Sequence, residues 1–315
     1  MRYLVTGAAG FLGTNLCLRL LQSGHEVLGI DNMSSAYEPN LQMLRQNPLF
    51  SFEKHDIVNK LPHLGKFDFI YNLACPASPA RYQRDPVQTF RTSVWGVWNV
   101  LQYALPCKTP VFHSSTSEIY GDPLEHPQKE SYWGHVNPVG MRACYDEGKR
   151  AAETLLFDFS RKHSHPIKVV RIFNTYGPHM DPKDGRVVSN FIMQALEGKP
   201  ISVYGDGTQT RSFCFVDDLM DAFLLVEKSA SDPASPINLG NPDEYTLLQL
   251  IETIEQILKK KIKRKFLPLP ADDPKQRRPD ISIAQKIGWN PKVRLQEGLK
   301  KTIEHFKGLN AYSKR

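Results

Sequence analysis

The sequence lacks several features that would place the protein in particular classes. It has no run of about eighteen apolar residues, so no membrane-spanning helix is expected. The first expected strand begins at residue 2, which leaves no room for a signal peptide. The cysteines are odd in number and form no Cys-x-x-Cys pair, which favours reduced thiols in a cytoplasmic protein. They are Cys17, Cys75, Cys107, Cys144 and Cys214.

Metal-ligand patterns and nucleic-acid-binding motifs are also missing. His113, His135 and His165 have no ligand spacing with carboxylates or cysteines, so no metal is expected. Lys and Arg exceed Asp and Glu by seven (40 minus 33), and the densest basic run, 259–265, fits a solvated helix end that leads into a strand. The positive charge therefore favours small anionic ligands, and no nucleic-acid partner is expected.

Apolar strands and amphipathic helices alternate through the first 172 residues. We expect strands at 2–6, 25–30, 50–54, 67–73, 110–114 and 167–172, and helices at 11–23, 86–104 and 142–162. This alternation predicts an α/β fold of the Rossmann type, with a doubly wound parallel sheet. After residue 173 the pattern changes to short strands and helices, which alternate with loops rich in Gly, Pro and Asp. We therefore expect a cofactor-binding Rossmann domain in 1–173 and a smaller, partly interleaved C-terminal substrate-binding lobe in 174–315.

A glycine-rich loop follows the first expected strand. Gly7 allows a tight turn, Gly10 lets the backbone approach a pyrophosphate, and Gly13 lets the following helix pack closely on the strand. The N-terminus of that helix presents unpaired N–H groups to phosphates. The alternative, a tight turn without a ligand, is less compatible with strand, glycines and helix in this order.

The second expected strand ends at Asp31. A carboxylate at this position suits the two ribose hydroxyls of the adenosine of NAD, and it would repel the extra phosphate of NADP. Asn32 and Met33, which follow, carry no positive charge. The expected cofactor is therefore NAD.

Tyr145 and Lys149 are four residues apart in an expected helix and share one of its faces. Most such pairs are ordinary helix surface. Beside a dinucleotide site, however, we expect the Lys149 ammonium to lower the pKa of the Tyr145 phenol, so that the phenol accepts a proton from a substrate hydroxyl near neutral pH.

Thr116, Ser117 and Glu118 follow the apolar strand that starts near Val111. Ligands of open parallel sheets bind at the carboxyl ends of the strands, so these residues are expected at the mouth of the site. Ser and Thr after a strand also fit simple turn chemistry, but Glu118 does not.

Together, these motifs resemble the extended short-chain dehydrogenases/reductases of the NAD-dependent epimerase/dehydratase family, which act on nucleotide sugars. The resemblance covers nearly the whole chain and is carried by 115–123, 132–138, 145–149, 171–178, 184–191 and 272–280. Ser117-Glu118 after Thr116, together with Arg277, resembles the UDP-glucuronate decarboxylases (UDP-xylose synthases). The alternatives are a dTDP-glucose 4,6-dehydratase and a nucleotide-sugar 4-epimerase.

The resemblance implies a role for each site residue. Tyr145 would be the base at the sugar O4, Thr116 would bind the same oxygen, and Lys149 would hold the nicotinamide ribose. Ser117, Glu118 and Arg277 would serve the carboxylate region and protonation at C5. The cofactor site would comprise Gly7, Gly10, Phe11, Leu12, Gly13, Asp31, Asn32, Asp56, Ile57, Leu73, Ala74, Tyr145 and Lys149. The substrate site would comprise Tyr82, Glu118, Asn174, Arg186, Asn190, Tyr204, Arg211 and Arg277.

Three positions depart from the family pattern. Ser93 stands where an Asn is usual, Cys75 replaces a common Ser, and 32–37 lacks the familiar Thr-Gly pattern. In addition, the helices expected at 86–104 and 142–162 carry more apolar residues than one sheet face needs. Trp95, Trp98, Leu101, Leu155, Leu156 and Phe159 contribute to this excess. A thick core would explain them, but we favour a homodimer joined by a four-helix bundle.

Overall fold

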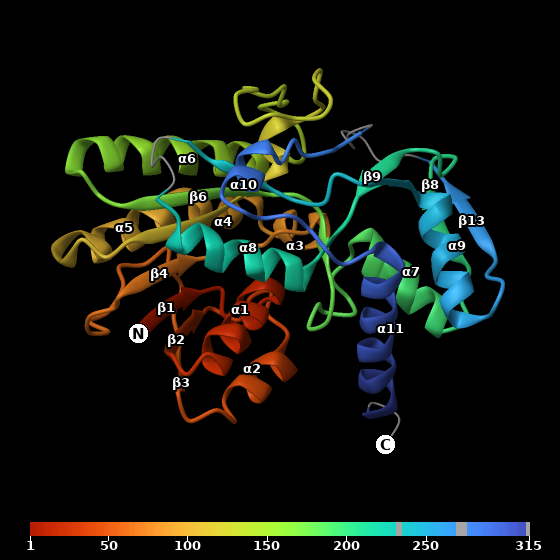
Figure 1. The fold of residues 1–315 in the computed structure, drawn as a ribbon, viewed down its shortest axis with the longest axis horizontal. Coiled ribbons are helices and arrows are strands. Elements are labelled where there is room, and N and C mark those ends of the chain that lie inside the picture. Colours follow the sequence, from red (N-terminus) through yellow and green to blue (C-terminus); the bar gives the residue numbers. More distant parts are fainter. Residues whose placement is uncertain (231–234, 269–275, 313–315) are drawn as a thin grey trace.

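A seven-stranded parallel sheet runs through the middle of the computed structural model, which describes residues 1–230, 235–268 and 276–312 (Figure 1). Its strands lie in the order β11-β6-β5-β4-β1-β2-β3. They are β1 (Arg2–Thr6), β2 (Glu26–Asp31), β3 (Phe50–Lys54), β4 (Phe69–Asn72), β5 (Val111–Thr116), β6 (Ile167–Ile172) and β11 (Ile237–Leu239). The strand order reverses beside β1, which confirms the predicted doubly wound Rossmann sheet.

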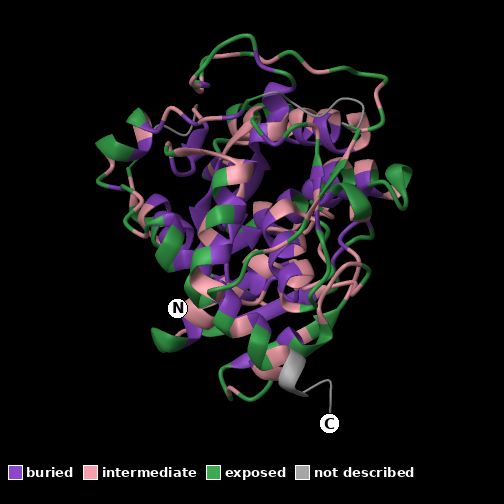
Figure 2. Cartoon of the chain, turned by 90° about the vertical axis from the view of Figure 1, so that its right-hand side faces the viewer, coloured by how far each residue is buried: buried purple, intermediate pink, exposed green. Residues whose placement is uncertain are grey.

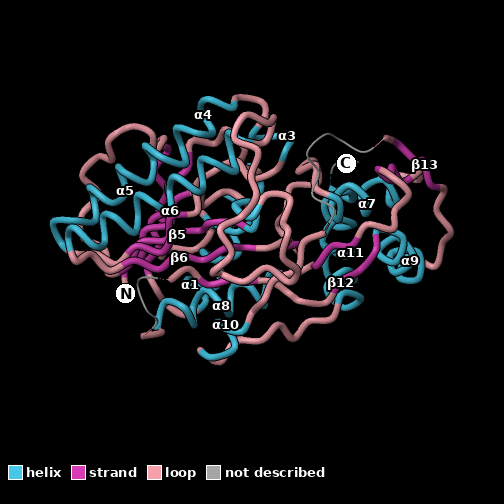
Figure 3. Tube along the Cα trace, turned by 90° about the horizontal axis from the view of Figure 1, so that it is seen from above, coloured by secondary structure: helices cyan, strands magenta, loops and turns pink. Residues whose placement is uncertain are grey.

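Helices cover both faces of this sheet because alternate side chains of each strand point to opposite sides. Tyr3 and Val5 of β1 pack into one apolar cluster, and Leu4 packs into another. Figure 3 shows the two helical layers, and Figure 2 shows the buried residues gathered between them. One layer has α1 (Phe11–Gln22), α2 (Glu38–Leu44) and α8 (Val216–Lys228), and the other has α4 (Pro86–Arg91), α5 (Val97–Ala104) and α6 (Ala143–His163).

The remaining elements form a smaller part to one side of the sheet, at the right of Figure 1. Its strands pair two by two: β7 (Thr175–Tyr176) with β10 (Cys214–Phe215), β9 (Thr210–Ser212) with β12 (Glu244–Thr246), and β8 (Ile201–Tyr204) with β13 (Arg264–Leu267). Its main helices are α7 (Val187–Leu196), α9 (Leu247–Leu258) and α11 (Leu295–Tyr312). Between these elements the chain returns to the large sheet, because β11 pairs with β6. The short helices α3 (Pro79–Tyr82) and α10 (Ser282–Lys286) lie in connecting segments.

The helix expected at 86–104 is interrupted by a π-helical turn, η1 (Thr92–Gly96), between α4 and α5. Such turns are frequent at functional sites. Ser93 lies in this turn, where its hydroxyl donates to the carbonyl of Thr89 (3.2 Å) and lies 3.4 Å from the Cys75 sulfur. A methyl group added to Gly148 of α6 would lie 3.1 Å from Ser93 Oγ, so the two helices approach closely here.

Another difference concerns β5, which was expected to end at residue 114 and instead runs to Thr116. The 3₁₀ turn η3 (Ser117–Tyr120) follows at once. Within the described ranges, no helix combines the length and apolar character needed to cross a membrane.

Candidate active site

Two adjoining cavities lie at the carboxyl ends of β1, β2, β4, β5 and β6, with volumes of about 550 and 150 Å³. They share part of their walls, including Leu12, Leu73, Cys75 and Arg186. The smaller cavity is lined by the residues expected at the cofactor, apart from Tyr145 and Lys149. The larger is lined by those two and by every residue expected at the substrate or in catalysis.

The glycine-rich loop forms one wall of the smaller cavity. Gly7 has a φ of +70°, and a side chain there would meet the backbone of Leu73 and Ala74 at 2.9 Å. A methyl group on Gly13 would lie only 2.0 Å from the Gly7 carbonyl oxygen, so α1 packs directly on the loop. Within the described part of the chain, no side chain caps the N-terminus of α1. Its first N–H groups are therefore available to an anionic group, as a pyrophosphate requires.

Asp31 stands beside this loop at the end of β2. One carboxylate oxygen accepts from the Ala9 N–H (3.1 Å), and the other accepts from the Met33 N–H (2.8 Å). Burial raises the pKa of Asp31, and these two donors oppose the shift. Each carboxylate oxygen can accept a second hydrogen bond, so the group can still receive a ribose diol. Nearby, the side chains of Asn32 and Gln88 both donate to Asp56 at 3.0 Å.

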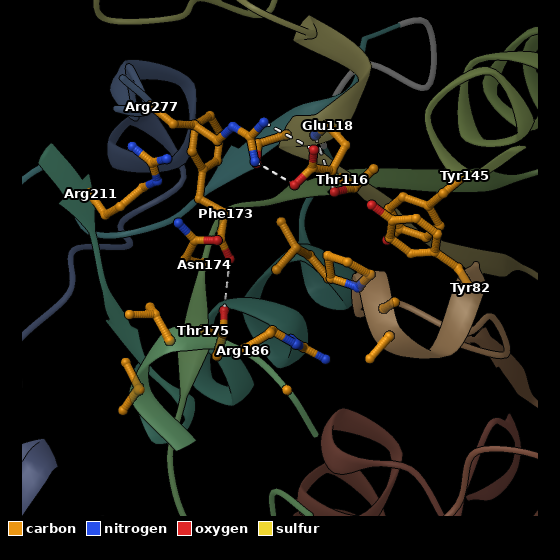
Figure 4. A pocket seen from close by; sticks show the side chains of 18 of the residues that line it. Tyr82, Thr116, Glu118, Tyr145, Phe173, Asn174, Thr175, Arg186, Arg211 and Arg277 are labelled. Carbon is orange, nitrogen blue, oxygen red and sulfur yellow. Dashed lines mark hydrogen bonds and ion pairs between the residues drawn. The ribbon is translucent and has the colours of Figure 1, made fainter. Parts of the chain in front are cut away.

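Tyr145 lines the larger cavity, where its phenol lies near Thr116 (Figure 4). Its ring stacks on that of Tyr82 of α3. Tyr145 is 5 % exposed, and this burial, followed by the influence of Cys75, raises its pKa above the ordinary value. Thr116 and Arg186 act in the opposite direction.

The expected effect of Lys149 on Tyr145 is wrong for this arrangement. The Lys149 Nζ donates to the Ser114 carbonyl oxygen at 2.7 Å and lies 5.9 Å from the centre of the Tyr145 ring. Burial also lowers the pKa of Lys149 itself. Lys149 is therefore fixed beside Tyr145 without being its hydrogen-bond partner, and burial determines the resting protonation of the phenol.

Glu118 is bound by two arginines at one end of the larger cavity. Arg277 donates to both carboxylate oxygens, with Nη2 3.0 Å from Oε2, and Arg142 donates to Oε2 as well (Figure 4 shows the Arg277 pair). Burial alone would raise the pKa of Glu118, but the charges of Arg277 and Arg142 outweigh it and lower the pKa to about 2. Glu118 is therefore a fixed anion at neutral pH, and the trio carries a net positive charge.

The other residues expected at the substrate come from the smaller part of the fold. Asn174 follows β6, Arg186 precedes α7 and pairs with Asp184 at 2.7 Å, and Asn190 lies in the first turn of α7. Tyr204 ends β8 and Arg211 lies on β9. These residues line the larger cavity, and Figure 4 shows Asn174 and Arg211 on its side away from Tyr145.

Arg142 was not expected from the sequence. Its position three residues before Tyr145 places both side chains on one side of the start of α6, and that spacing could have indicated it. Phe173 and Thr175, which flank Asn174, also line the cavity unexpectedly. Among the described residues, no group of three or more His, Cys, Asp or Glu side chains is arranged to hold a metal ion. Residues 272–275 of the expected segment 272–280 lie outside the described residues.

Proteins of known sequence resemble the chain along nearly its whole length. It is 49% identical over 309 residues to UDP-glucuronic acid decarboxylase 6 of Arabidopsis thaliana, covering 98% of this chain and 89% of the relative. It is 46% identical to UDP-glucuronic acid decarboxylase 1 of Danio rerio, covering 97% of this chain and 72% of that relative.

Solved structures give the same fold. The UDP-glucuronic acid 4-epimerase of Bacillus cereus, in complex with UDP-glucuronic acid and NAD, matches with a TM-score of 0.88 and 30% identity, over 98% of this chain and 100% of the other. The UDP-glucose 4-epimerase of Thermotoga maritima matches with a TM-score of 0.90 and 29% identity, with the same coverage. The model of the NAD dependent epimerase/dehydratase family matches residues 3–240. With a family model that spans most of the chain and relatives this similar in sequence, the protein belongs to the NAD dependent epimerase/dehydratase family.

Proposed function

We propose that the protein decarboxylates UDP-glucuronate to UDP-xylose and CO₂, with NAD reduced and reoxidised within one catalytic cycle. The observation that carries this proposal is the Glu118 carboxylate held by Arg277 and Arg142 beside Thr116 and Tyr145. This arrangement offers a cationic position for a substrate carboxylate close to Thr116 and Tyr145, which would remove the proton of a sugar hydroxyl. The names of the relatives in Arabidopsis thaliana and Danio rerio support the same reaction.

NAD is the cofactor of the family, and the smaller cavity fits it. The uncapped N-terminus of α1 would hold the pyrophosphate, Asp31 the adenosine ribose, and Lys149 the nicotinamide ribose. When bound, NAD supplies the hydride acceptor and, in its oxidised form, a positive charge near the reacting atoms.

In this proposal, Tyr145 receives the proton of the sugar O4 while C4 loses a hydride, so that C4 and O4 become a ketone. Since burial keeps the phenol protonated at rest, its proton must leave before it acts as a base. The Thr116 hydroxyl and the Arg186 charge both favour the phenolate, so they lower the cost of that step. Thr116 would also hold O4 in line with Tyr145.

The ketone places the substrate carboxylate in the β position, so that loss of CO₂ leaves an enolate stabilised at O4. A proton then adds at C5, and the hydride returns to C4 to give the pentose. Arg277 cannot be the proton donor, because a guanidinium does not deprotonate in proteins. Its role would be to orient the carboxylate and the water that protonates C5, with Ser117 and Glu118 fixing the geometry.

The larger cavity would hold the nucleotide on the wall formed by Asn174, Arg186, Asn190, Tyr204 and Arg211. Arginine suits the pyrophosphate because it donates two parallel hydrogen bonds. In this view residues 1–173 serve mainly NAD, and residues 174–315 serve mainly the nucleotide sugar.

The direct test is turnover of UDP-glucuronate by the purified protein, followed by mass spectrometry of the nucleotide sugar and by CO₂ release. We expect UDP-xylose and no net accumulation of NADH. A product of unchanged mass would instead indicate 4-epimerisation, the second candidate. The fold match to the Bacillus cereus UDP-glucuronic acid 4-epimerase favours this candidate. Conversion of dTDP-glucose with UDP-glucuronate ignored would indicate a 4,6-dehydratase.

A homodimer and a cytoplasmic location complete the proposal. Trp95 and Trp98 remain 52 % and 44 % exposed along η1 and α5, which suits a seam formed with α6 of a second copy. In contrast, Leu101, Leu156 and Phe159 pack in the core of the subunit. The free thiols of all five cysteines suit a reducing compartment. Light scattering of Trp95→Glu beside the unsubstituted protein tests the seam, where we expect a monomer for the variant.

A further inference from the structure

Asp146 is a buried acid in the first turn of α6, directly after Tyr145. The whole residue is only 6 % exposed. One carboxylate oxygen, Oδ1, is buried and has no hydrogen-bond partner among the described residues. The other, Oδ2, lies 3.9 Å from Nε of Arg142, which is too long for a hydrogen bond. A carboxylate buried with so little direct support is costly in its ionised form.

The groups around Asp146 belong largely to the charged trio described above. Glu118 of η3, Arg142 and Arg277 all influence it electrostatically, and so does Glu147, its neighbour on α6. Tyr82 of α3 and Cys144 of α6 face it as well. Glu147 is one-third exposed and lies 3.5 Å from Arg150, so it belongs to the helix surface.

We propose that Asp146 is a specificity-determining residue whose protonation sets the charge that the Arg142–Glu118–Arg277 trio presents to the carboxylate of a uronic acid. With Asp146 neutral, the four side chains carry two positive charges and one negative charge. With Asp146 ionised, they carry two of each and no longer attract an anion. This inference rests on the proposed function, because it assigns the substrate carboxylate to this end of the cavity.

The titration of these groups agrees with that role. Burial, and then the negative charge of Glu118, raises the pKa of Asp146 to about 7, while Arg142 and Arg277 oppose the shift. Asp146 is therefore neutral below this pH and anionic above it. Glu118 stays ionised throughout, since its pKa is lowered to about 2. Burial raises the pKa of Tyr82, Tyr145 and Cys144, which keeps these groups neutral. Among the described groups near the trio, Asp146 is thus the one that changes charge around neutrality.

A pH-dependent preference between two ligands follows. UDP-glucuronate carries the carboxylate and UDP-xylose does not, although both share the nucleotide and most of the sugar. Raising the pH from about 6 to about 8 should weaken the binding of UDP-glucuronate about tenfold relative to the binding of UDP-xylose. This is the size expected when one negative charge is added near the bound carboxylate in a partly screened site. The affinity for UDP-xylose should change little, because no carboxylate meets Asp146.

Binding of both ligands can be measured by calorimetry in the Tyr145→Phe background, with NAD present, so that substrate is not consumed. We expect the ratio of the two affinities to fall about tenfold with pH in this protein and to stay constant when Asp146→Asn is added. Glu147→Gln is the matched control and should retain the full pH dependence. A ratio that is independent of pH before Asp146 is changed, or equal pH dependence with Asp146→Asn, overturns the inference. Loss of UDP-xylose binding in Asp146→Asn also overturns the inference, because a purely structural role of Asp146 would then explain the result.

A second measurement does not require a substrate. Infrared spectra of the protein labelled at its aspartates should show a protonated carboxyl band that disappears with a midpoint near neutral pH and that is missing in Asp146→Asn. Absence of such a band at about pH 6 overturns the inference, whatever the substrate. Failure of the proposed function is recognised separately, since the unsubstituted enzyme would then release no CO₂ from UDP-glucuronate.

Discussion

The ring of Tyr82 lies flat against the ring of Tyr145, with centroids 5.1 Å apart and planes inclined by 5°. Tyr82 is almost fully buried, and its hydroxyl makes no hydrogen bond among the described residues. Its flat surface, rather than its hydroxyl, therefore holds the phenol of Tyr145 in place.

Tyr82→Phe should consequently retain most of kcat, whereas Tyr82→Ala should lower kcat by about tenfold or more, because the phenol loses its stacked support. Steady-state kinetics of the two variants makes this comparison. Equal loss of kcat in both would show that the Tyr82 hydroxyl, not the ring, is needed.

Tyr145→Phe removes the proposed base and leaves the stacked ring. We expect folding and NAD binding to be unchanged and turnover to fall by about 10²–10⁴-fold, the usual contribution of general base catalysis. NAD affinity by fluorescence and CO₂ release from UDP-glucuronate are the two readouts. Turnover near the original rate would remove Tyr145 from the mechanism.

Arg277→Ala should separate oxidation from decarboxylation. Tyr145, Thr116 and Lys149 remain, so enzyme-bound NADH can still form slowly, while CO₂ and UDP-xylose should be scarce. Absorbance of NADH and product analysis in the same sample test this. Arg277→Lys is the matched variant, and it should also be impaired, because lysine lacks the two-pronged geometry that binds both oxygens of Glu118. Full CO₂ release by the alanine variant would contradict the assigned role.

Asp31→Ala should narrow the preference for NAD over NADP. The change removes the acceptor for the ribose hydroxyls together with the charge that repels a 2′-phosphate. Titration of both cofactors into the two proteins gives the ratio of their dissociation constants. If the unsubstituted protein binds NADP as tightly as NAD, Asp31 does not select the cofactor.

Glu118 should make the stability of the protein depend on pH at acid values. Its pKa is lowered from 4.5 to about 2, so its contribution is complete above about pH 4.5 and is lost as the pH falls toward 2. Near neutral pH this shift corresponds to about 3 kcal/mol. The free energy of unfolding of Glu118→Gln should therefore be lower than that of the original protein at about pH 6, and the difference should shrink at about pH 3.5. A constant difference would argue against the shift. Glu147→Gln, on the helix surface, should differ little at either pH.

The sequence predicts well what depends on neighbours along the chain. Gly7, Gly10 and Gly13 follow a buried strand and precede a helix, so their cavity could be anticipated from local order. The sheet could be anticipated from the alternation of strands and helices. The resemblance to nucleotide-sugar enzymes supplied Arg277 and Arg186, which no local pattern marks.

What could not be predicted depends on contacts between distant segments. Glu118 and Arg277 are 159 residues apart in the chain, and the ion pairs of Arg277 and Arg142 with Glu118 form only because the fold brings these segments together. The protonation of Tyr145 depends on its burial in the cavity and on Cys75 beside it, which spacing from Lys149 does not reveal. Likewise, the close approach of the π-helical turn at 92–96 to Gly148 of α6 joins two distant segments, so no local pattern indicates it.

Because the chain returns to the large sheet and places β11 beside β6, this protein cannot be divided into two independently folding halves. A fragment ending near residue 173 would leave β6 as an unprotected edge strand, with its backbone N–H and C=O groups open to pairing with another molecule. It would also lose α8, which packs on α1. Gene fusions, split reporters or module exchanges cut at this point should therefore give aggregated material, whereas a cut that keeps β11 with the first half would preserve the sheet.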